Sequence, residues 1–281
     1  MNAFANAPEV KKIPLRSGDD LAIYHFDTSP NPERSIFFVS GSGCVSLRYF
    51  LKDYFAGLPS GYRVYAAQKK GVAAFETGAS CSEKFIENYS FKALLETNKQ
   101  GLIWSTVDFG KAPTAIIGVS EGGTLAAALA AENPEIENLV IIGAGGMTFR
   151  TELEILAERR GNIEQLQRGF AAIEKDPSST TKTFWGHPHA YWSSMLDINP
   201  MEYFAVTTQK VFIFAGALDE SVPSESPVLL ANTLREDAGR TVIIDLVSGA
   251  NHILKRDGED LKPQIMSNLD HWFQQAHELE P

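Results

Sequence analysis

The chain has 281 residues, 44% of them hydrophobic, and carries a formal net charge of −10 with an isoelectric point near 5.1. This size and composition suffice for one large core, or for a core with a small additional segment. The negative charge argues against nucleic acids and anionic membranes as partners, and no apolar stretch approaches the roughly 18 residues of a membrane-spanning helix.

Strand-like and helical stretches alternate over most of the chain. The first two strands are predicted near Val10–Arg16 and Leu21–Phe26, and the Ser17-Gly18-Asp19-Asp20 sequence between them is typical of a hairpin turn. From about residue 35 onward, strands alternate with helices, which predicts a mostly parallel sheet. The later strands are expected at Ser35–Val39, Tyr62–Ala67 and Thr114–Ile117, just before Gly143, and at Lys210–Ala215 and Thr241–Val247.

The loop after the third strand, Ser40-Gly41-Ser42-Gly43-Cys44, is rich in glycine. Together with Ser46 it half-matches a dinucleotide-binding fingerprint, but the third glycine of that fingerprint is missing. The next strand is followed by Gln68, where an acidic residue would be needed to bind a ribose. We therefore expect no nucleotide site here.

Cys44 in this loop and Cys81 beyond the fourth strand are the two cysteines of the chain. Both are expected at the same edge of the sheet, so a disulfide between them is one alternative. Met1–Ala7 has neither the basic start nor the apolar core of a secretion signal, which favours a cytoplasmic protein with two free thiols. A periplasmic or secreted protein is the alternative if a signal peptide has been removed. Two cysteines alone cannot hold a metal, and we expect no metal and no cofactor.

Gly118-Val119-Ser120-Glu121-Gly122 is the most informative motif of the chain. An apolar strand-like run precedes it, and the helical run Thr124–Ala131 follows it. The motif G-x-S-x-G therefore falls on a sharp strand-to-helix turn, the context in which it presents a nucleophilic serine. The sequence predicts Ser120 as a catalytic nucleophile. The alternative is a serine that caps an ordinary helix.

A serine that attacks an acyl group requires hydrogen-bond donors for the oxyanion of the transition state. One donor is expected to be the N–H of Glu121, the residue after the nucleophile. The other is expected from the loop after the third strand. Ser42 is the first candidate for this second donor, and Gly43 is the alternative.

The alternation of strands and helices stops in the segment 147–200. Two helices are predicted there, an amphipathic one at Thr151–Arg160 and a second at Ile163–Lys175, and no strand is expected. We therefore divide the chain into a core of residues 1–146 and 201–281 and a helical insertion of residues 147–200.

The insertion contains a run of aromatic residues. These rings are expected either to form the wall of a substrate pocket or only to attach the insertion to the sheet. The candidates for the pocket are Cys44, Phe149, Trp185, His187, Tyr191 and Trp192.

Two further polar residues follow the last two predicted strands. Asp219 lies in the loop after the seventh strand, and His252 lies in the loop after the eighth. Polar residues just beyond the ends of parallel strands converge at one edge of the sheet. We expect His252 to be the general base for Ser120 and Asp219 to orient it, with Glu220 as the alternative acid.

These motifs resemble those of the α/β-hydrolases over nearly the whole chain, because serine, acid and histidine follow in the order of that family. The Ser120-Glu121-Gly122-Gly123 turn and the segment Ala190–Pro200, followed closely by the strand before Asp219, are similar to its bacterial prolyl oligopeptidase-like and serine aminopeptidase-like branch. The resemblance implies an α/β-hydrolase fold, with a mostly parallel eight-stranded sheet flanked by helices. It also implies a small helical lid after the sixth strand.

The function expected from these residues is that of a serine hydrolase. The first candidate substrate is a carboxylic ester with a small or medium acyl group, cleaved through an acyl-enzyme. The alternatives are an aminopeptidase, amidase or thioesterase acting on a small substrate, and a protein of this fold that binds a ligand without chemistry. We expect a small-molecule ester or amide as partner, with no nucleic acid and no membrane. The sequence does not define the oligomeric state.

Overall fold

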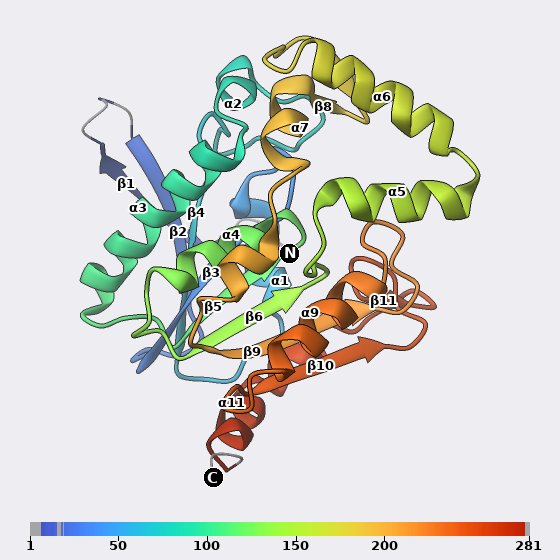
Figure 1. Ribbon diagram of the computed structural model, residues 1–281. Coiled ribbons are helices and arrows are strands. Elements are labelled where there is room, and N and C mark those ends of the chain that lie inside the picture. The colour runs from blue at the N-terminus through green and yellow to red at the C-terminus, as the bar shows by residue number, and fades with distance from the viewer. Residues whose placement is uncertain (1–6, 16–17, 19, 279–281) are drawn as a thin grey trace.

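The computed structural model describes residues 7–15, 18 and 20–278. Most of the Met1–Ala7 segment, on which the prediction about a secretion signal was made, lies outside these residues. The predicted turn Ser17–Asp20 lies partly outside them. At the centre is an eight-stranded sheet in the order β1-β2-β4-β3-β5-β6-β9-β10 (Figure 1). Its strands are β1 (Glu9–Pro14), β2 (Asp20–Asp27), β3 (Arg34–Val39), β4 (Tyr62–Ala67), β5 (Ala115–Val119), β6 (Asn138–Ile142), β9 (Lys210–Gly216) and β10 (Val242–Val247).

The directions of the strands agree with the mostly parallel sheet predicted from the sequence. β1 pairs with β2 and β2 pairs with β4 in antiparallel fashion, whereas every pair from β4 to β10 is parallel. Each of the eight predicted strands corresponds to a strand of this sheet. The α/β-hydrolase fold class expected from the sequence is therefore confirmed.

Side chains of the central strands alternate between two apolar faces, because helices cover both sides of the sheet. In β3, Phe37 faces one core cluster, and Ile36 and Phe38 face the other. The helices α3 (Phe91–Phe109), α4 (Glu121–Ala131), α8 (Pro200–Phe204) and α9 (Glu225–Arg235) pack on the Phe37 side, and α1 (Leu51–Tyr54), α10 (Lys262–Ser267) and α11 (Leu269–Glu278) pack on the opposite side. The remaining short elements are η1 (Leu47–Tyr49), α2 (Glu83–Glu87), β11 (Lys255–Arg256) and β12 (Glu259–Asp260).

The parallel register brings the carboxyl ends of the strands to one edge of the sheet. Val39 at the end of β3 lies opposite Gly118 of β5, and Val247 at the end of β10 lies opposite Gly216 of β9. The loops that follow β3, β5, β9 and β10 therefore meet at this edge. They contain the residues that the sequence singled out for catalysis.

The segment 147–200 covers this edge with three helices, α5 (Phe149–Arg160), α6 (Ile163–Lys175) and α7 (His189–Met195). Figure 1 shows α5 and α6 beyond the arrowhead end of β6. α6 has the predicted bounds. α5 begins before the predicted Thr151 because the Thr148 side chain caps it, accepting a hydrogen bond from the Thr151 N–H at 3.2 Å.

The expectation of no strand in this segment was wrong. β7 (Thr183–Phe184) and β8 (His187–Pro188) form a short antiparallel hairpin. Its two turn residues both have positive φ, 45° for Trp185 and 80° for Gly186. A two-residue turn of this kind matches the twist of paired strands, but strands of two residues leave no alternation for a sequence pattern to reveal.

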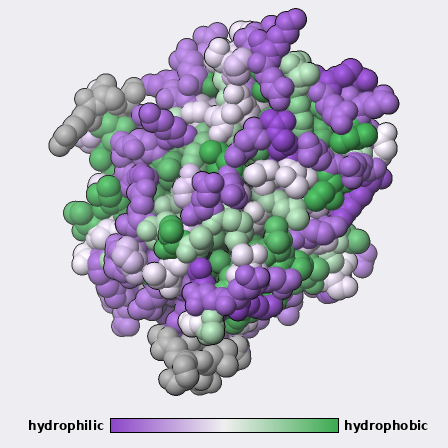
Figure 2. All heavy atoms as spheres, viewed as in Figure 1, coloured by the Kyte–Doolittle hydropathy of each residue, from purple (hydrophilic) through white to green (hydrophobic). Residues whose placement is uncertain are grey.

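The surface around these helices is mixed in character. Figure 2 shows hydrophilic residues over much of the visible face and hydrophobic residues in smaller, separate areas. Within the described ranges, no helix is both long enough and apolar enough to cross a membrane.

Candidate active site

Ser120 lies on the turn between β5 and α4, where the G-x-S-x-G motif predicts it. Its backbone has φ 51° and ψ −123°, a conformation that persists only where the surrounding structure holds it. A Cβ atom on Gly118 would lie 2.4 Å from the Gly122 carbonyl oxygen, and one on Gly122 would lie 2.3 Å from the Val39 carbonyl oxygen. Both glycines are required by this close approach. The Ser120 side chain makes no capping bond to α4, so the alternative of an ordinary helix cap was wrong.

A chain of hydrogen bonds links Ser120 to His252 and Asp219. The His252 Nε2 atom lies 3.1 Å from the Ser120 Oγ atom, and the His252 Nδ1 atom lies 2.8 Å from the Asp219 Oδ2 atom. The other carboxylate oxygen of Asp219 accepts hydrogen bonds from the N–H groups of Ser221 and Val222, at 2.8 and 2.9 Å. The buried carboxylate is thereby held with one oxygen on the imidazole. This arrangement allows proton transfer between the serine hydroxyl and the histidine.

Glu220, the alternative acid, contacts the backbone of the histidine and not its ring. Its carboxylate accepts a hydrogen bond from the His252 backbone N–H at 3.3 Å and does not contact the imidazole nitrogens. The backbone carbonyl of Glu220 accepts a hydrogen bond from Arg160 at the end of α5. Of the two adjacent acids, the geometry favours Asp219 as the partner of the ring.

The glycine-rich loop after β3 runs directly beside the turn that carries Ser120. A Cβ atom on Gly41 would lie 3.2 Å from the Val119 carbonyl oxygen and 3.4 Å from the Ser120 Cβ atom. Glu121 is the first residue of α4, so its N–H has no acceptor within the helix. In the part of the chain that the structure describes, no acceptor takes the Ser42 N–H.

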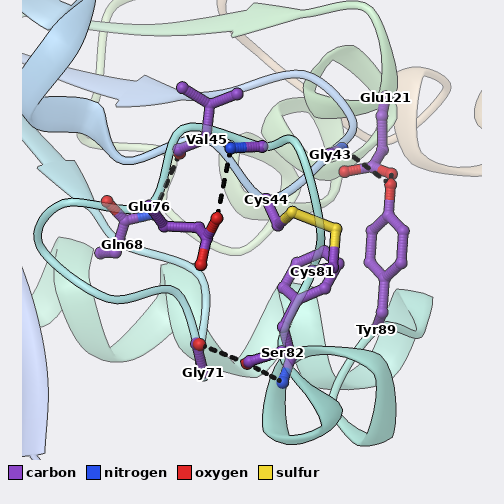
Figure 3. The surroundings of a disulfide bond; sticks show 12 residues. Gly43, Cys44, Val45, Gln68, Gly71, Glu76, Cys81, Ser82, Tyr89 and Glu121 are labelled. Carbon is purple, nitrogen blue, oxygen red and sulfur yellow. Dashed lines mark hydrogen bonds between the residues drawn. A yellow bond between two sulfur atoms is a disulfide. The ribbon is translucent and has the colours of Figure 1, made fainter.

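Gly43, the alternative second donor, is less available than Ser42. Its N–H already donates a hydrogen bond to the Tyr89 hydroxyl, at 3.0 Å (Figure 3). This geometry favours the N–H groups of Glu121 and Ser42 as the candidate donors beside the nucleophile.

The expectation of free thiols was also wrong, because Cys44 and Cys81 form a disulfide (Figure 3). The loops after β3 and β4 run side by side, with Val45 bridged to Thr77, and this brings the two Cα atoms to 5.6 Å, well within bonding range. Cys44 is consequently buried and does not line the cavity described next, in contrast to the sequence-based prediction.

A cavity of about 280 Å³ lies between Ser120 and the segment 147–200. Apart from Cys44, all the predicted pocket residues line it, and Ser42 and Glu121 lie on its wall. His187 is packed among aromatic rings, with its ring centroid 4.7 Å from that of Tyr191 and 5.4 Å from that of Trp192. Burial lowers the pKa of His187, so its imidazole is a neutral part of an aromatic wall.

Glu152 of α5 also lines this cavity, and sequence analysis missed it. Its buried carboxylate accepts a hydrogen bond from the Ser226 hydroxyl at 2.6 Å. Burial raises the pKa of Glu152 to about 8, against the opposing effect of the Ser226 hydrogen bond, and the charge of Asp219 raises it further. The available signal was its spacing, since Glu152 shares one helix face with Phe149 and Leu156.

Among the residues that the structure describes, no cluster of three or more histidine, cysteine, aspartate or glutamate side chains is arranged to hold a metal ion. The chemistry that the described geometry supports is nucleophilic catalysis by a serine with a histidine base.

The sequence model of the prolyl oligopeptidase family matches residues 109–279, more than half of the chain. The match includes Ser120, Asp219 and His252. No curated protein matches the chain.

Solved structures of hydrolases share the fold. A puromycin-hydrolysing peptidase of Mycobacterium tuberculosis has 16% identity and a TM-score of 0.61, over 100% of this chain and 41% of that chain. The esterase domain of a Rhodothermus marinus protein has 16% identity and a TM-score of 0.61, over 95% and 98% of the two chains. An acylaminoacyl peptidase of Pyrococcus horikoshii has 12% identity and a TM-score of 0.61, over 96% and 42%. The chain thus spans less than half of either peptidase.

Proposed function

The chain belongs to the prolyl oligopeptidase family and is a serine hydrolase, and from this premise we propose that it cleaves a carboxylic ester with a small or medium acyl group through an acyl-enzyme. The observation that carries the proposal is the hydrogen-bonded chain of Ser120, His252 and Asp219, in which Ser120 lines an aromatic-walled cavity of about 280 Å³. This volume suits a small acyl group.

In the proposed mechanism, His252 Nε2 takes the proton of Ser120 as the hydroxyl oxygen attacks the carbonyl carbon of the ester. Asp219 fixes the tautomer in which Nε2 is free to accept that proton, and it stabilises the imidazolium that forms. The protonated His252 then donates the proton to the leaving alcohol. The acyl group remains on Ser120 as an ester.

The N–H groups of Glu121 and Ser42 are proposed to bind the oxyanion that develops in this step. They support the transition state more than the ground state, because the negative charge exists only there. In the second half of the reaction, His252 removes a proton from water as the water oxygen attacks the carbonyl carbon of the acyl-enzyme. His252 then returns this proton to the Ser120 oxygen as its bond to the acyl carbon breaks, and the free acid leaves.

The helical segment 147–200 is proposed to act as a lid that forms the substrate pocket. Trp185, Tyr191 and Trp192 line the cavity with Phe149, which favours an apolar or aromatic group on the substrate. The esterase domain of the Rhodothermus protein is similar to this chain over almost its full length, which favours an ester.

A peptide or amide is the second candidate substrate. The family match and the similarity to the two peptidases favour it. The same residues would serve, since His252 can protonate a leaving amine as well as a leaving alcohol.

The disulfide bears on where the protein works. Disulfides persist mainly in oxidising compartments, so the Cys44–Cys81 bond favours the periplasmic or secreted alternative over the cytoplasm.

The test combines labelling with a substrate panel. We expect the native protein to react with a fluorophosphonate probe and to hydrolyse short p-nitrophenyl esters faster than aminoacyl p-nitroanilides. Ser120→Ala should remain folded, escape labelling and lose on the order of 10⁴-fold or more in kcat. Faster turnover of the nitroanilides would support the peptide alternative. A native protein that stays unlabelled and inactive on both substrate classes would instead support a ligand-binding protein.

A further inference from the structure

A buried ion pair lies directly behind the candidate oxyanion hole. The Lys69 ammonium donates a hydrogen bond to the Glu121 carboxylate at 2.7 Å, and the two side chains are 6% and 1% exposed. Removing both charges from water is costly, and an apolar pair of similar volume is often at least as stable. Stability alone therefore gives little reason for an ion pair at this place.

The ion pair links two loops that are distant in the sequence. Lys69 follows β4, and its ammonium also donates to the carbonyl oxygen of Gly41 at 2.6 Å. Glu121 belongs to the turn of the nucleophile. One ammonium group thus holds the glycine-rich loop against that turn.

Tyr89 makes a second connection between the same two segments. Its hydroxyl donates to the other carboxylate oxygen of Glu121 at 2.9 Å and accepts from the Gly43 N–H at 3.0 Å (Figure 3). Burial raises the pKa of Tyr89 well above its ordinary value, so the hydroxyl keeps its proton. The Tyr89 ring packs between Phe85 and Tyr191, with ring centroids at 4.4 and 4.2 Å.

The two connections bracket Ser42. Gly41 is held through its carbonyl by Lys69, and Gly43 is held through its N–H by Tyr89. Both connections end on the side chain of Glu121, whose own N–H is the other candidate donor. The Ser42 N–H between them has no acceptor in the described part of the chain.

We propose that Lys69 and Tyr89 are positioning residues that use the Glu121 carboxylate to fix the Ser42 and Glu121 N–H groups at one separation before substrate binds. The inference rests on the proposed function, because it assigns these two N–H groups to the oxyanion. Neither Lys69 nor Tyr89 lines the cavity beside Ser120. Their effect is to preorganise the donors, so that no reorganisation is needed as the charge develops.

The first test is Lys69→Met, which keeps an unbranched chain of similar length and removes the ammonium. We expect kcat for a p-nitrophenyl ester to fall about 10- to 100-fold with KM changed less than about threefold, since loss of one oxyanion donor costs about 10²- to 10³-fold. The inhibition constant of a boronic acid should rise in proportion to the loss of kcat, because its tetrahedral adduct with Ser120 places an oxygen in the oxyanion hole.

The second variant, Tyr89→Phe, removes only a hydroxyl and decides the question if Lys69→Met does not fold. It should lower kcat about 5- to 30-fold, again with KM nearly constant and with weaker boronic acid binding. The matched control is Tyr65→Phe in β4, which removes a hydroxyl that is hydrogen-bonded to Asp108 at 2.7 Å and not to Glu121 or Gly43. It should leave kcat and the boronic acid constant unchanged.

Two results would overturn the proposal while the hydrolase function stands. One is a folded Tyr89→Phe with kcat and boronic acid affinity within about twofold of the native protein. The other is a loss in which kcat falls only together with the folded fraction measured by thermal unfolding. If the native protein is neither labelled by a fluorophosphonate nor active, the proposed function itself fails. That outcome is distinguishable because it does not depend on either variant.

Discussion

Both carboxylate oxygens of Asp219 accept or share hydrogen bonds, and these bonds distinguish Asp219 from the adjacent Glu220 as the partner of His252. Two backbone N–H groups, from Ser221 and Val222, hold one oxygen, and the His252 Nδ1 atom contacts the other. The turn that supplies these donors also directs the Glu220 side chain to the His252 backbone. The two adjacent acids therefore have different partners, although both are carboxylates that could orient a histidine.

Asp219→Asn is expected to keep the shape of the site and to favour the wrong tautomer of His252. We expect kcat on the best ester substrate to fall by about 10³- to 10⁴-fold, as for other triads. Glu220→Gln, the adjacent control, should change kcat by less than about threefold, because the Glu220 carboxylate bonds to the His252 backbone N–H and not to its ring. Steady-state kinetics of both variants check this. The opposite ranking would move the orienting role to Glu220.

Polar residues at strand ends were predictable from the sequence, whereas the residues behind them were not. Ser120, Asp219 and His252 each follow an apolar strand, so the parallel sheet by itself brings them to one edge. Lys69 stands in Gln68-Lys69-Lys70-Gly71, which reads as a solvated loop. Lys69 is buried because it pairs with the side chain of Glu121, which comes from a distant part of the chain. The residues next to Lys69 in the sequence do not indicate this contact.

At the scale of elements, the hydrophobic pattern predicted the strands and helices that form the core. It did not predict the short strands of the segment 147–200. α6 was predicted to its ends, because Ile163, Leu166 and Phe170 recur at helical spacing on one buried or half-buried face. The β7–β8 hairpin was missed because a positive φ at Trp185 is a tertiary effect rather than a preference of tryptophan.

The contact between α5 and α9 has a chemical consequence. The Glu152 carboxylate of α5 and the Ser226 hydroxyl of α9 form a buried hydrogen bond, and the Ser226 hydroxyl also accepts from the Met147 N–H at 3.0 Å. Burial raises the pKa of Glu152 from an ordinary value of 4.5 to about 8. Between these two pH values the folded protein holds a proton that the unfolded chain has lost.

Glu152→Gln should therefore stabilise the protein in a pH-dependent way. Since the folded state binds the extra proton, the free energy of unfolding of the native protein should fall as pH rises from about 4.5 to about 8, by up to roughly 1.4 kcal/mol per pH unit. Glutamine cannot ionise, so the variant should escape this loss, and its advantage over the native protein should grow from about pH 4.5 and level off above about pH 8. Below about pH 4.5 the two should agree. Urea unfolding at a series of pH values measures both.

Glu158→Gln is the control for this prediction, because Glu158 is an exposed acid on the same helix. It should leave the pH profile of stability as it is in the native protein. A Glu152→Gln profile that runs parallel to that of the native protein would contradict the assignment of this pH dependence to the α5–α9 contact.

At the scale of the whole molecule, the Cys44–Cys81 bond joins the loops after two neighbouring strands, across a sequence separation of 37 residues. The loop that the bond closes contains η1, α1 and β4. One end of it follows Ser42 and Gly43 directly. The same covalent link therefore bears on the stability of the fold and on the position of the proposed oxyanion loop.

Reduction of this bond should lower both stability and activity. By restricting the unfolded chain, the bond should add roughly 3–4 kcal/mol to the free energy of unfolding. Its loss corresponds to a fall in Tm on the order of 5–10 °C for a domain of this size. We expect kcat to fall several-fold under reductant, because the loop of Ser42 loses its covalent anchor but keeps its bonds to Lys69 and Tyr89. The variant with Cys44→Ala and Cys81→Ala is the control, since reductant should change neither its Tm nor its kcat. Protein isolated without reductant should show no free thiol on denaturation, and two titratable thiols would contradict the bond.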